Sequence, residues 1–272
     1  GEERSVCYVD GDVSEWTEAD LVAAAGDLEL SMKYDEKFLY FLVRKPGLDP
    51  RTDTLYIPLD VTPRSGSTYC QNYRVGFERA CDFLVVIRGP DQSRVVVQKR
   101  YEALASTYAA EYYADDYYIN VPDPDTPYFE RIKLPLVLEE VLPDRSAEEG
   151  SGLAYETGKL RHGNANPESE DFDSLADFIF AGDYVELRLP WQLLNFSNPS
   201  EMQIHDDYYQ HYGIENLSIR EIYAGAGDGP GQRIPMEAFP LEGWGKRPAS
   251  HERLKRSYYI LRDYWAALDG KA

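Results

Sequence analysis

Cysteine and histidine are scarce in this sequence. It has three cysteines, Cys7, Cys70 and Cys81, and four histidines among 272 residues. The cysteines form neither a Cys-x-x-Cys pair nor a close cluster with histidine, so their spacing excludes a zinc-finger or iron–sulfur site. One disulfide, with Cys70 and Cys81 closing a short loop, and three reduced, buried thiols both fit this count. Cysteine usage therefore leaves the cellular compartment open.

Positive charge and long hydrophobic runs are also in short supply. The chain carries 28 Lys and Arg against 48 Asp and Glu, a formal net charge of −20 at pH 7. Because neutralising phosphates requires clustered positive charge, this balance excludes nucleic acid as a partner and makes anionic membrane surfaces a poor candidate. No apolar run reaches the roughly 18–20 residues that span a bilayer, so we expect no direct membrane insertion. Neutral polyols and cations remain open as ligands.

Tyrosine, in contrast, is abundant. The chain has 22 tyrosines, and aromatic residues total 13% of the sequence. A tyrosine has a flat apolar face and a polar tip, so a surplus suits both β-sheet surfaces and the recognition of partly polar ligands.

The first hundred residues have the periodicity of β-strands. Residues 28–34 alternate apolar and polar side chains, and residues 35–37 then form a turn before the apolar run 38–43. Such a run predicts a strand that is covered on both faces. Residues 82–87 and 94–98 flank a Gly-Pro-Asp-Gln turn and predict a hairpin. Pro58, within a strand predicted over 55–61, indicates that the neighbouring side is unpaired or bulged there.

The rest of the chain predicts further strands, an acidic insertion and one helix. We expect an insertion at about 101–175, because residues 139–173 hold ten acidic and three basic residues and few large apolar ones. Strands are expected at 178–180, 184–190 and 217–223. Apolar residues at three- and four-residue steps predict a basic C-terminal helix at about 250–269. No linker divides the chain, so residues 1–272 are expected to form a single antiparallel β-sandwich domain.

Four segments resemble a known family. They are Val9-Asp10-Gly11-Asp12-Val13-Ser14-Glu15-Trp16, residues 28–40 ending in Asp-Glu-Lys-Phe-Leu-Tyr, Tyr56-Ile57-Pro58-Leu59-Asp60, and Glu186-Leu187-Arg188-Leu189-Pro190-Trp191. The pattern resembles family 9 carbohydrate-binding modules, which belong to a wider DOMON-like group of β-sandwiches. The resemblance covers roughly residues 6–100 and 177–225.

This resemblance implies a non-catalytic carbohydrate-binding module of a larger extracellular or cell-surface protein. Its partners would be a neutral polysaccharide or oligosaccharide and other domains of the parent protein. One alternative is an interaction domain that keeps the fold without binding sugar. A second alternative is a glycoside-active or haem-binding redox domain, but the sequence has no motif of a hydrolase nucleophile, zinc protease or phosphate loop.

Aromatic residues near carboxylates are the expected sugar-binding groups, because pyranose rings stack on flat aromatic faces. The tetrad Asp-Asp-Tyr-Tyr occurs twice, at 115–118 and 206–209. Since neighbouring side chains on a strand point to opposite faces, one ring of each pair is expected to face inward. Trp244, between two glycines, is the best single stacking candidate, whereas Trp191 and Trp16 are expected in the core. The predicted ligand-binding residues are Trp244, Tyr117, Tyr118, Tyr208, Tyr209, Asp116 and Asp207.

A structural calcium ion is the cofactor that the acidic turns suggest, because calcium prefers carboxylate and carbonyl oxygens. Its predicted ligands are Asp10, Asp60 and Asp116. His205 and His211 could contribute to a metal or acid–base site, although exposed loop histidines explain them as well. The glycine-rich segment 225–231 is expected to be a flexible hairpin tip.

Overall fold

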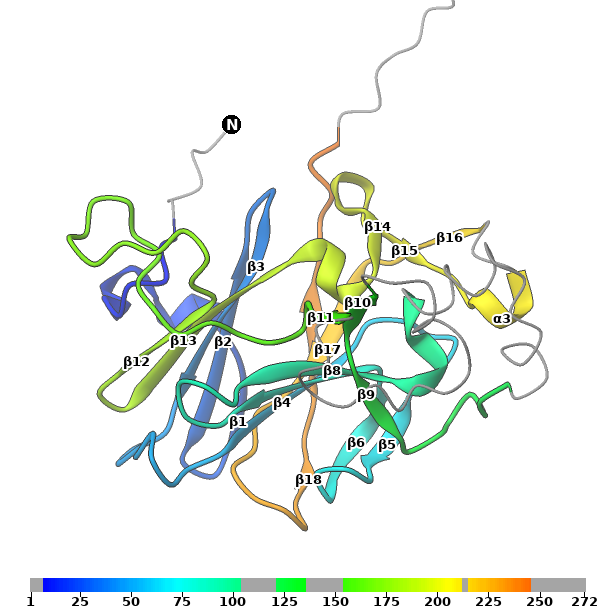
Figure 1. Cartoon of the computed structure of the whole chain (residues 1–272), viewed down its shortest axis with the longest axis horizontal. Coiled ribbons are helices and arrows are strands. Elements are labelled where there is room, and N and C mark those ends of the chain that lie inside the picture. Colours follow the sequence, from blue (N-terminus) through cyan, green and yellow to red (C-terminus); the bar gives the residue numbers. More distant parts are fainter. Residues whose placement is uncertain (1–6, 104–120, 136–153, 212–214, 246–272) are drawn as a thin grey trace, which may run out of the picture.

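The chain folds as an antiparallel β-sandwich, as the sequence predicts (Figure 1). The structure is a computed structural model, and it describes residues 7–103, 121–135, 154–211 and 215–245. The expected C-terminal helix at 250–269 lies outside the described residues, as does part of the interval 101–175. Within the described ranges, no helix is long and apolar enough to cross a membrane.

Two large sheets form the sandwich. The five-stranded sheet has the order β1-β2-β3-β13-β12, with bounds Leu21–Ala25, Leu28–Tyr34, Phe38–Arg44, Tyr184–Pro190 and Phe178–Ala181. The six-stranded sheet has the order β19-β17-β4-β7-β8-β9, with bounds Glu237–Pro240, Glu221–Ala224, Leu55–Asp60, Phe83–Ile87, Arg94–Gln98 and Phe129–Arg131. The predicted hairpin of residues 82–87 and 94–98 is β7–β8.

Three small sheets and several short helices surround the sandwich. One sheet joins β18 (Arg233–Ile234), β6 (Val75–Cys81) and β5 (Ser67–Cys70), and β18 runs parallel to β6. A second joins β14 (Phe196–Asn198), β15 (Gln203–His205) and β16 (Asn216–Ser218), and a third joins β10 (Lys133–Pro135) and β11 (Ala154–Glu156). The helices are η1 (Val13–Glu15), η2 (Glu18–Asp20), η3 (Lys99–Tyr101), η5 (Trp191–Leu194), η6 (Pro199–Glu201) and α3 (Tyr208–His211).

The main core lies between the two large sheets. The alternating residues of β2 place Leu28, Leu30 and Met32 in this core, and β3 and β13 contribute every second residue in the same way. Trp191 is 1% exposed, which confirms that it is a core residue. Each fully buried large apolar side chain contributes about 1.5–3 kcal/mol, so this alternation accounts for much of the driving force for folding.

Both large sheets also have covered outer faces, which explains their continuous apolar runs. The β5–β6 sheet packs on the outer side of the six-stranded sheet, where Leu84 and Val86 meet Phe77. The N-terminal segment from Cys7 to Trp16 packs against Tyr40 on the outer side of the five-stranded sheet. The expectation that residues 38–43 form a strand covered on both faces is therefore confirmed. The thiols of all three cysteines are free and buried.

Pro58 interrupts the hydrogen-bond ladder of β4, as predicted. Tyr56 and Gly227 exchange two hydrogen bonds of 2.8 and 2.9 Å across this edge. Pro58 has no N–H group and only accepts one, from Gly225 N at 3.4 Å. β17 therefore pairs continuously with β4 only at Leu59 and Asp60.

Two details of the later chain differ from the sequence-based expectation. Residues 217–223 do not form one strand, because the chain leaves β16 at Ser218 and enters β17 at Glu221 in another sheet. The segment 225–231 is not a flexible tip throughout: a Cβ atom on Gly225 would lie 2.0 Å from Pro235 O. Glycine is required there because the backbones of two segments approach closely.

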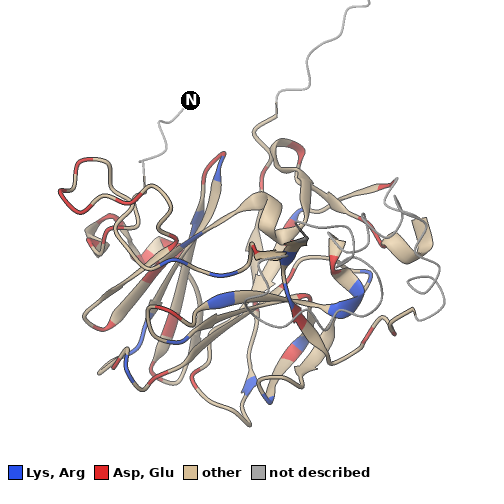
Figure 2. Cartoon of the chain, viewed as in Figure 1, with Lys and Arg blue, Asp and Glu red and all other residues tan. Residues whose placement is uncertain are grey.

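Negative charge is concentrated in loops. In Figure 2 the loop between β11 and β12 carries several acidic positions, marked in red, and its sequence includes Glu168, Glu170, Asp171 and Asp173. This loop lies on the same side of the molecule as the N-terminal segment, and Asn166 donates to Asp10 Oδ2 at 2.8 Å.

Candidate ligand-binding pocket

Glu186 anchors the N-terminal segment to the five-stranded sheet. Its Oε2 accepts hydrogen bonds from Asp10 N and Gly11 N, both at 3.1 Å, and its Oε1 accepts one from Trp16 Nε1 at 2.9 Å. Burial raises the pKa of Glu186 to about 7, although these three donors favour the charged form. Gly11 has a φ of 86°, which glycine adopts without strain. The Asp10-Gly11 turn, Trp16 and Glu186 therefore meet at one structural contact.

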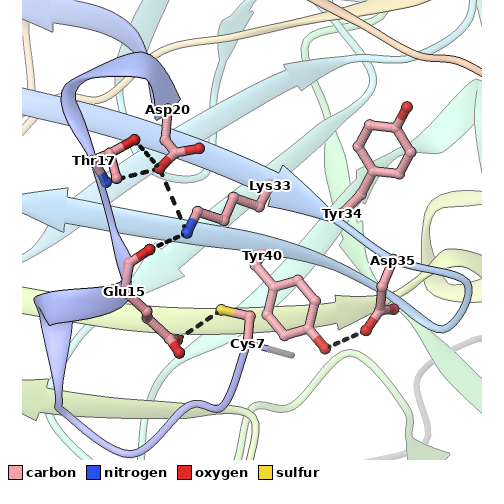
Figure 3. A pocket seen from close by; sticks show the side chains of 8 residues that line it. All are labelled: Cys7, Glu15, Thr17, Asp20, Lys33, Tyr34, Asp35 and Tyr40. Carbon is pink, nitrogen blue, oxygen red and sulfur yellow. Dashed lines mark hydrogen bonds and ion pairs between the residues drawn. The ribbon is translucent and has the colours of Figure 1, made fainter. Parts of the chain in front are cut away.

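A pocket of about 320 Å³ lies beside this anchor (Figure 3). The N-terminal segment contributes Cys7, Glu15, Thr17 and Asp20 to its walls. β2, the following turn and β3 contribute Lys33, Tyr34, Asp35 and Tyr40. Lys33 and Tyr40 are directly paired across β2 and β3, and both side chains face the N-terminal segment.

Lys33 forms the charged centre of the pocket. Its Nζ donates a hydrogen bond to Glu15 O and lies 3.4 Å from Asp20 Oδ2. It also lies 4.7 Å from the centre of the Trp16 ring, a cation–π contact. Asp20 Oδ2 is held in turn by Thr17, whose backbone N and Oγ1 donate at 2.8 and 3.0 Å. The Lys33 side chain is 19% exposed, so a ligand could reach an already positioned ammonium group.

The pocket also contains two neutral donors that are held by carboxylates. Tyr40 OH donates to Asp35 Oδ2 at 2.8 Å, and Cys7 Sγ donates to Glu15 Oε1 at 3.0 Å. Burial raises the pKa of the Tyr40 phenol and of the Cys7 thiol well above their usual values, so both are protonated at neutral pH. Cys7, Glu15 and Glu186 place their polar atoms within 4.8 Å of one another, as metal ligands do. A protonated thiol and occupied carboxylates account for this cluster without a metal.

Aromatic rings support the pocket at Tyr34. The Tyr34 ring lies 5.8 Å from that of Trp191, 6.5 Å from that of Trp244 and 6.0 Å from that of Phe239. Its hydroxyl accepts from Glu242 N at 2.9 Å and donates to Glu242 O at 3.2 Å. Trp244, the predicted stacking residue, is half-buried and does not line this pocket. The Trp244 ring instead packs against the ring of Tyr34, and Tyr34 lines the pocket.

Residues of the second Asp-Asp-Tyr-Tyr tetrad lie in two different environments, a buried ion pair and a cavity wall. Asp207 forms a buried ion pair with Arg100, whose Nη2 lies 2.7 Å from Asp207 Oδ2. Tyr209 packs its ring 4.8 Å from the Arg100 guanidinium. Asp207 is one of the predicted ligand-binding residues, and in the structure its side chain is buried and paired with Arg100. The other predicted residues of this kind, Asp116, Tyr117 and Tyr118, lie outside the described residues.

Tyr208 lines a second concavity, the end cavity, of about 600 Å³. The end cavity is bounded largely by apolar side chains such as Phe83, Ile132 and Phe196. Tyr208 OH lies 3.2 Å from His205 Nδ1 within it, and Ser197 Oγ is buried without a hydrogen-bond partner. His205 is half-buried rather than exposed, and burial lowers its pKa. The sequence did not reveal this cavity, because its walls come from segments between residues 83 and 208.

Of the predicted calcium ligands, Asp10 and Asp60 are each held by other partners, and Asp116 lies outside the described residues. Asp10 accepts from Asp12 N and from Asn166, and Asp60 pairs with Arg79 at 3.0 Å. Burial raises the pKa of Asp60 to about 6. Neither residue belongs to a group of possible metal ligands in the part of the chain that the structure describes.

The residues of the pocket beside Glu186 were missed because the segments that carry them were read as structural. Lys33 occupies the outward position of an alternating strand, and Asp20 lies in a short helix after Trp16. The signal in the sequence that could have located this pocket was an outward-facing lysine opposite a tyrosine, close to a turn that contains a tryptophan. Comparison of the chain with protein-family models, with curated proteins and with solved structures finds no match in any of the three.

Proposed function

We propose that this chain is a non-catalytic carbohydrate-binding domain and that the pocket beside Glu186 holds one sugar unit of a neutral glycan. The observation that carries the proposal is the lining: carboxylates, an ammonium group, hydroxyls and tyrosine rings face one space of about 320 Å³. Ligand pockets usually measure about 300–1,000 Å³, so this volume suits a single small polar ligand.

Sugar hydroxyls both donate and accept hydrogen bonds, and the pocket offers partners of both kinds. Lys33 Nζ is a donor, whereas the Asp20 and Asp35 carboxylates are acceptors. The existing hydrogen bonds hold these groups in place before binding, which lowers the entropic cost of association. The pocket lining has three carboxylates, those of Glu15, Asp20 and Asp35, and one ammonium group, so it disfavours anionic ligands.

On this proposal the domain belongs to a larger extracellular or cell-surface protein and has no catalytic role of its own. The competing function is an interaction domain without sugar binding. Exposed large side chains support it, because Tyr155 is 63% and Leu175 67% exposed, and such residues are found at protein contacts.

Binding to neutral polysaccharides, measured by affinity gel electrophoresis and calorimetry, tests the proposal. Lys33→Met and Asp20→Asn are each expected to weaken glycan binding at least tenfold. Lys45→Met is the matched control, because Lys45 has a 20% exposed side chain and pairs with Asp53 and Asp228 away from the pocket. If no neutral glycan binds, or if Lys33→Met behaves as Lys45→Met does, the sugar proposal is wrong and the interaction domain is favoured.

A further inference from the structure

A second cluster of polar side chains joins the end of β15 to the start of β16. Asp206 follows β15, His211 ends α3, and Glu215 precedes β16. One ligand atom from each lies within 4.8 Å of the others. His211 Nδ1 is 2.8 Å from Asp206 Oδ2 and 3.8 Å from Glu215 Oε2. From this geometry we propose that Asp206, His211 and Glu215 bind a divalent transition-metal ion of the zinc type.

His211 gives independent support, because its Nδ1 atom is buried and has no hydrogen-bond partner. The atom lies close to Asp206 Oδ2, but this contact lacks the alignment of a hydrogen bond. A buried imidazole nitrogen close to two carboxylate oxygens is an arrangement that a bound cation satisfies.

The buried carboxylate of Asp206 also favours a cation at this position. Its side chain is 3% exposed, and burying a carboxylate without a partner is costly. Oδ1 accepts a hydrogen bond from Asp207 N at 2.8 Å, whereas the nearest cationic side chain apart from His211, Arg64, lies 3.8 Å away and is half-exposed. Among the described residues, the side chain that lies against Asp206 Oδ2 is that of His211, so a cation bound beside it would compensate this oxygen.

The distances suit zinc. Zinc–ligand bonds of about 2.0–2.2 Å in a tetrahedron place neighbouring ligand atoms about 3.3–3.6 Å apart. The observed separations of 2.8 and 3.8 Å lie on either side of this value, so shifts of about half an ångström would accommodate the ion. An imidazole nitrogen among the ligands favours zinc over calcium, which prefers oxygen ligands. The fourth position would be left for water.

The site has a consequence for the end cavity. The ion would join Asp206, which directly follows His205, to His211 at the end of α3, and Tyr208 of this helix lines the cavity. Metal binding would therefore hold His205 and Tyr208 in place.

Zinc titration of the full chain after removal of metal with EDTA tests the site. We expect one zinc ion per chain by calorimetry, a rise in melting temperature with zinc, and no competition by millimolar calcium. His211→Ala and Asp206→Asn are each expected to weaken zinc binding at least tenfold and to abolish the rise in melting temperature. Circular dichroism shows whether each variant folds.

His162→Ala is the control, because His162 packs against Phe178 and Phe180 and belongs to no such cluster. Cobalt substitution gives a second readout, with visible absorption that depends on His211. If zinc binds the parent protein well below one equivalent, or binds His211→Ala unchanged, the proposal is overturned.

Discussion

Removing the charge of Asp207 should greatly lower the free energy of unfolding of this protein. The side chains of Arg100 and Asp207 are 6% and 4% exposed, so water cannot replace the lost partner. Asp207 Oδ2 accepts from Arg100 Nε at 3.2 Å and from Nη2 at 2.7 Å, and Oδ1 accepts from Tyr209 N at 2.9 Å. An asparagine can keep the bond to Tyr209 N, but its amide N–H groups would then face the guanidinium.

The expected cost of Asp207→Asn is about 3–5 kcal/mol, the range for breaking a buried ion pair and leaving one charge uncompensated. Arg100 keeps one hydrogen bond, from Nη1 to Pro122 O at 2.8 Å, which does not neutralise its charge. Because typical domains are stable by about 5–15 kcal/mol, this loss is large. Arg100→Met combined with Asp207→Asn removes both charges and should recover at least about 2 kcal/mol relative to the sum of the single changes.

Urea unfolding followed by tryptophan fluorescence measures these differences. Glu29→Gln is the matched control, because Glu29 and its partner Arg44 are 45% and 39% exposed and such a pair contributes up to about 1 kcal/mol. If Asp207→Asn changes the free energy of unfolding by less than about 0.5 kcal/mol, the buried ion pair is not a stabilising contact.

Three other outcomes follow from the structure. Burial raises the pKa of Glu186 to about 7 and that of Asp60 to about 6. The folded protein therefore keeps protons that the unfolded chain releases near pH 4, so the free energy of unfolding should fall as pH rises from about 4.5 to 7. The fall is about 3 kcal/mol for Glu186. Urea unfolding measures it across this interval, and a rise in the free energy of unfolding with pH would contradict the prediction. Trp244→Ala should lower the free energy of unfolding by about 1–3 kcal/mol, because the ring packs on the core; full stability in a folded variant would mean that the ring is free for ligand. Gly225→Ala should cost about 1–3 kcal/mol. Gly229→Ala, where nothing lies within 4 Å of the added Cβ, should cost nothing, and equal melting temperatures for the two variants would refute the close approach.

The strands were predictable because strand periodicity is local. Alternation in residues 28–34 reports which face is buried, and the turn residues at 89–92 mark the hairpin directly in the sequence. Pro58 revealed a break in pairing because it lacks an N–H group wherever it occurs. These features depend on neighbours within a few residues, so the fold class followed from them.

The functional surfaces depend on contacts between distant residues. Glu186 and Gly11 are 175 positions apart, yet their hydrogen bond sets the N-terminal segment against β2 and thereby forms the pocket around Lys33. Composition suggested Asp207 as a ligand-binding residue, but its burial against Arg100, 107 positions away, was decided by packing. The alternation of apolar residues thus specified the β-sandwich locally. Which polar groups meet ligand, and which neutralise one another inside the protein, arose only when the sheets and loops came together, because desolvation and pairing depend on the three-dimensional neighbours of a group.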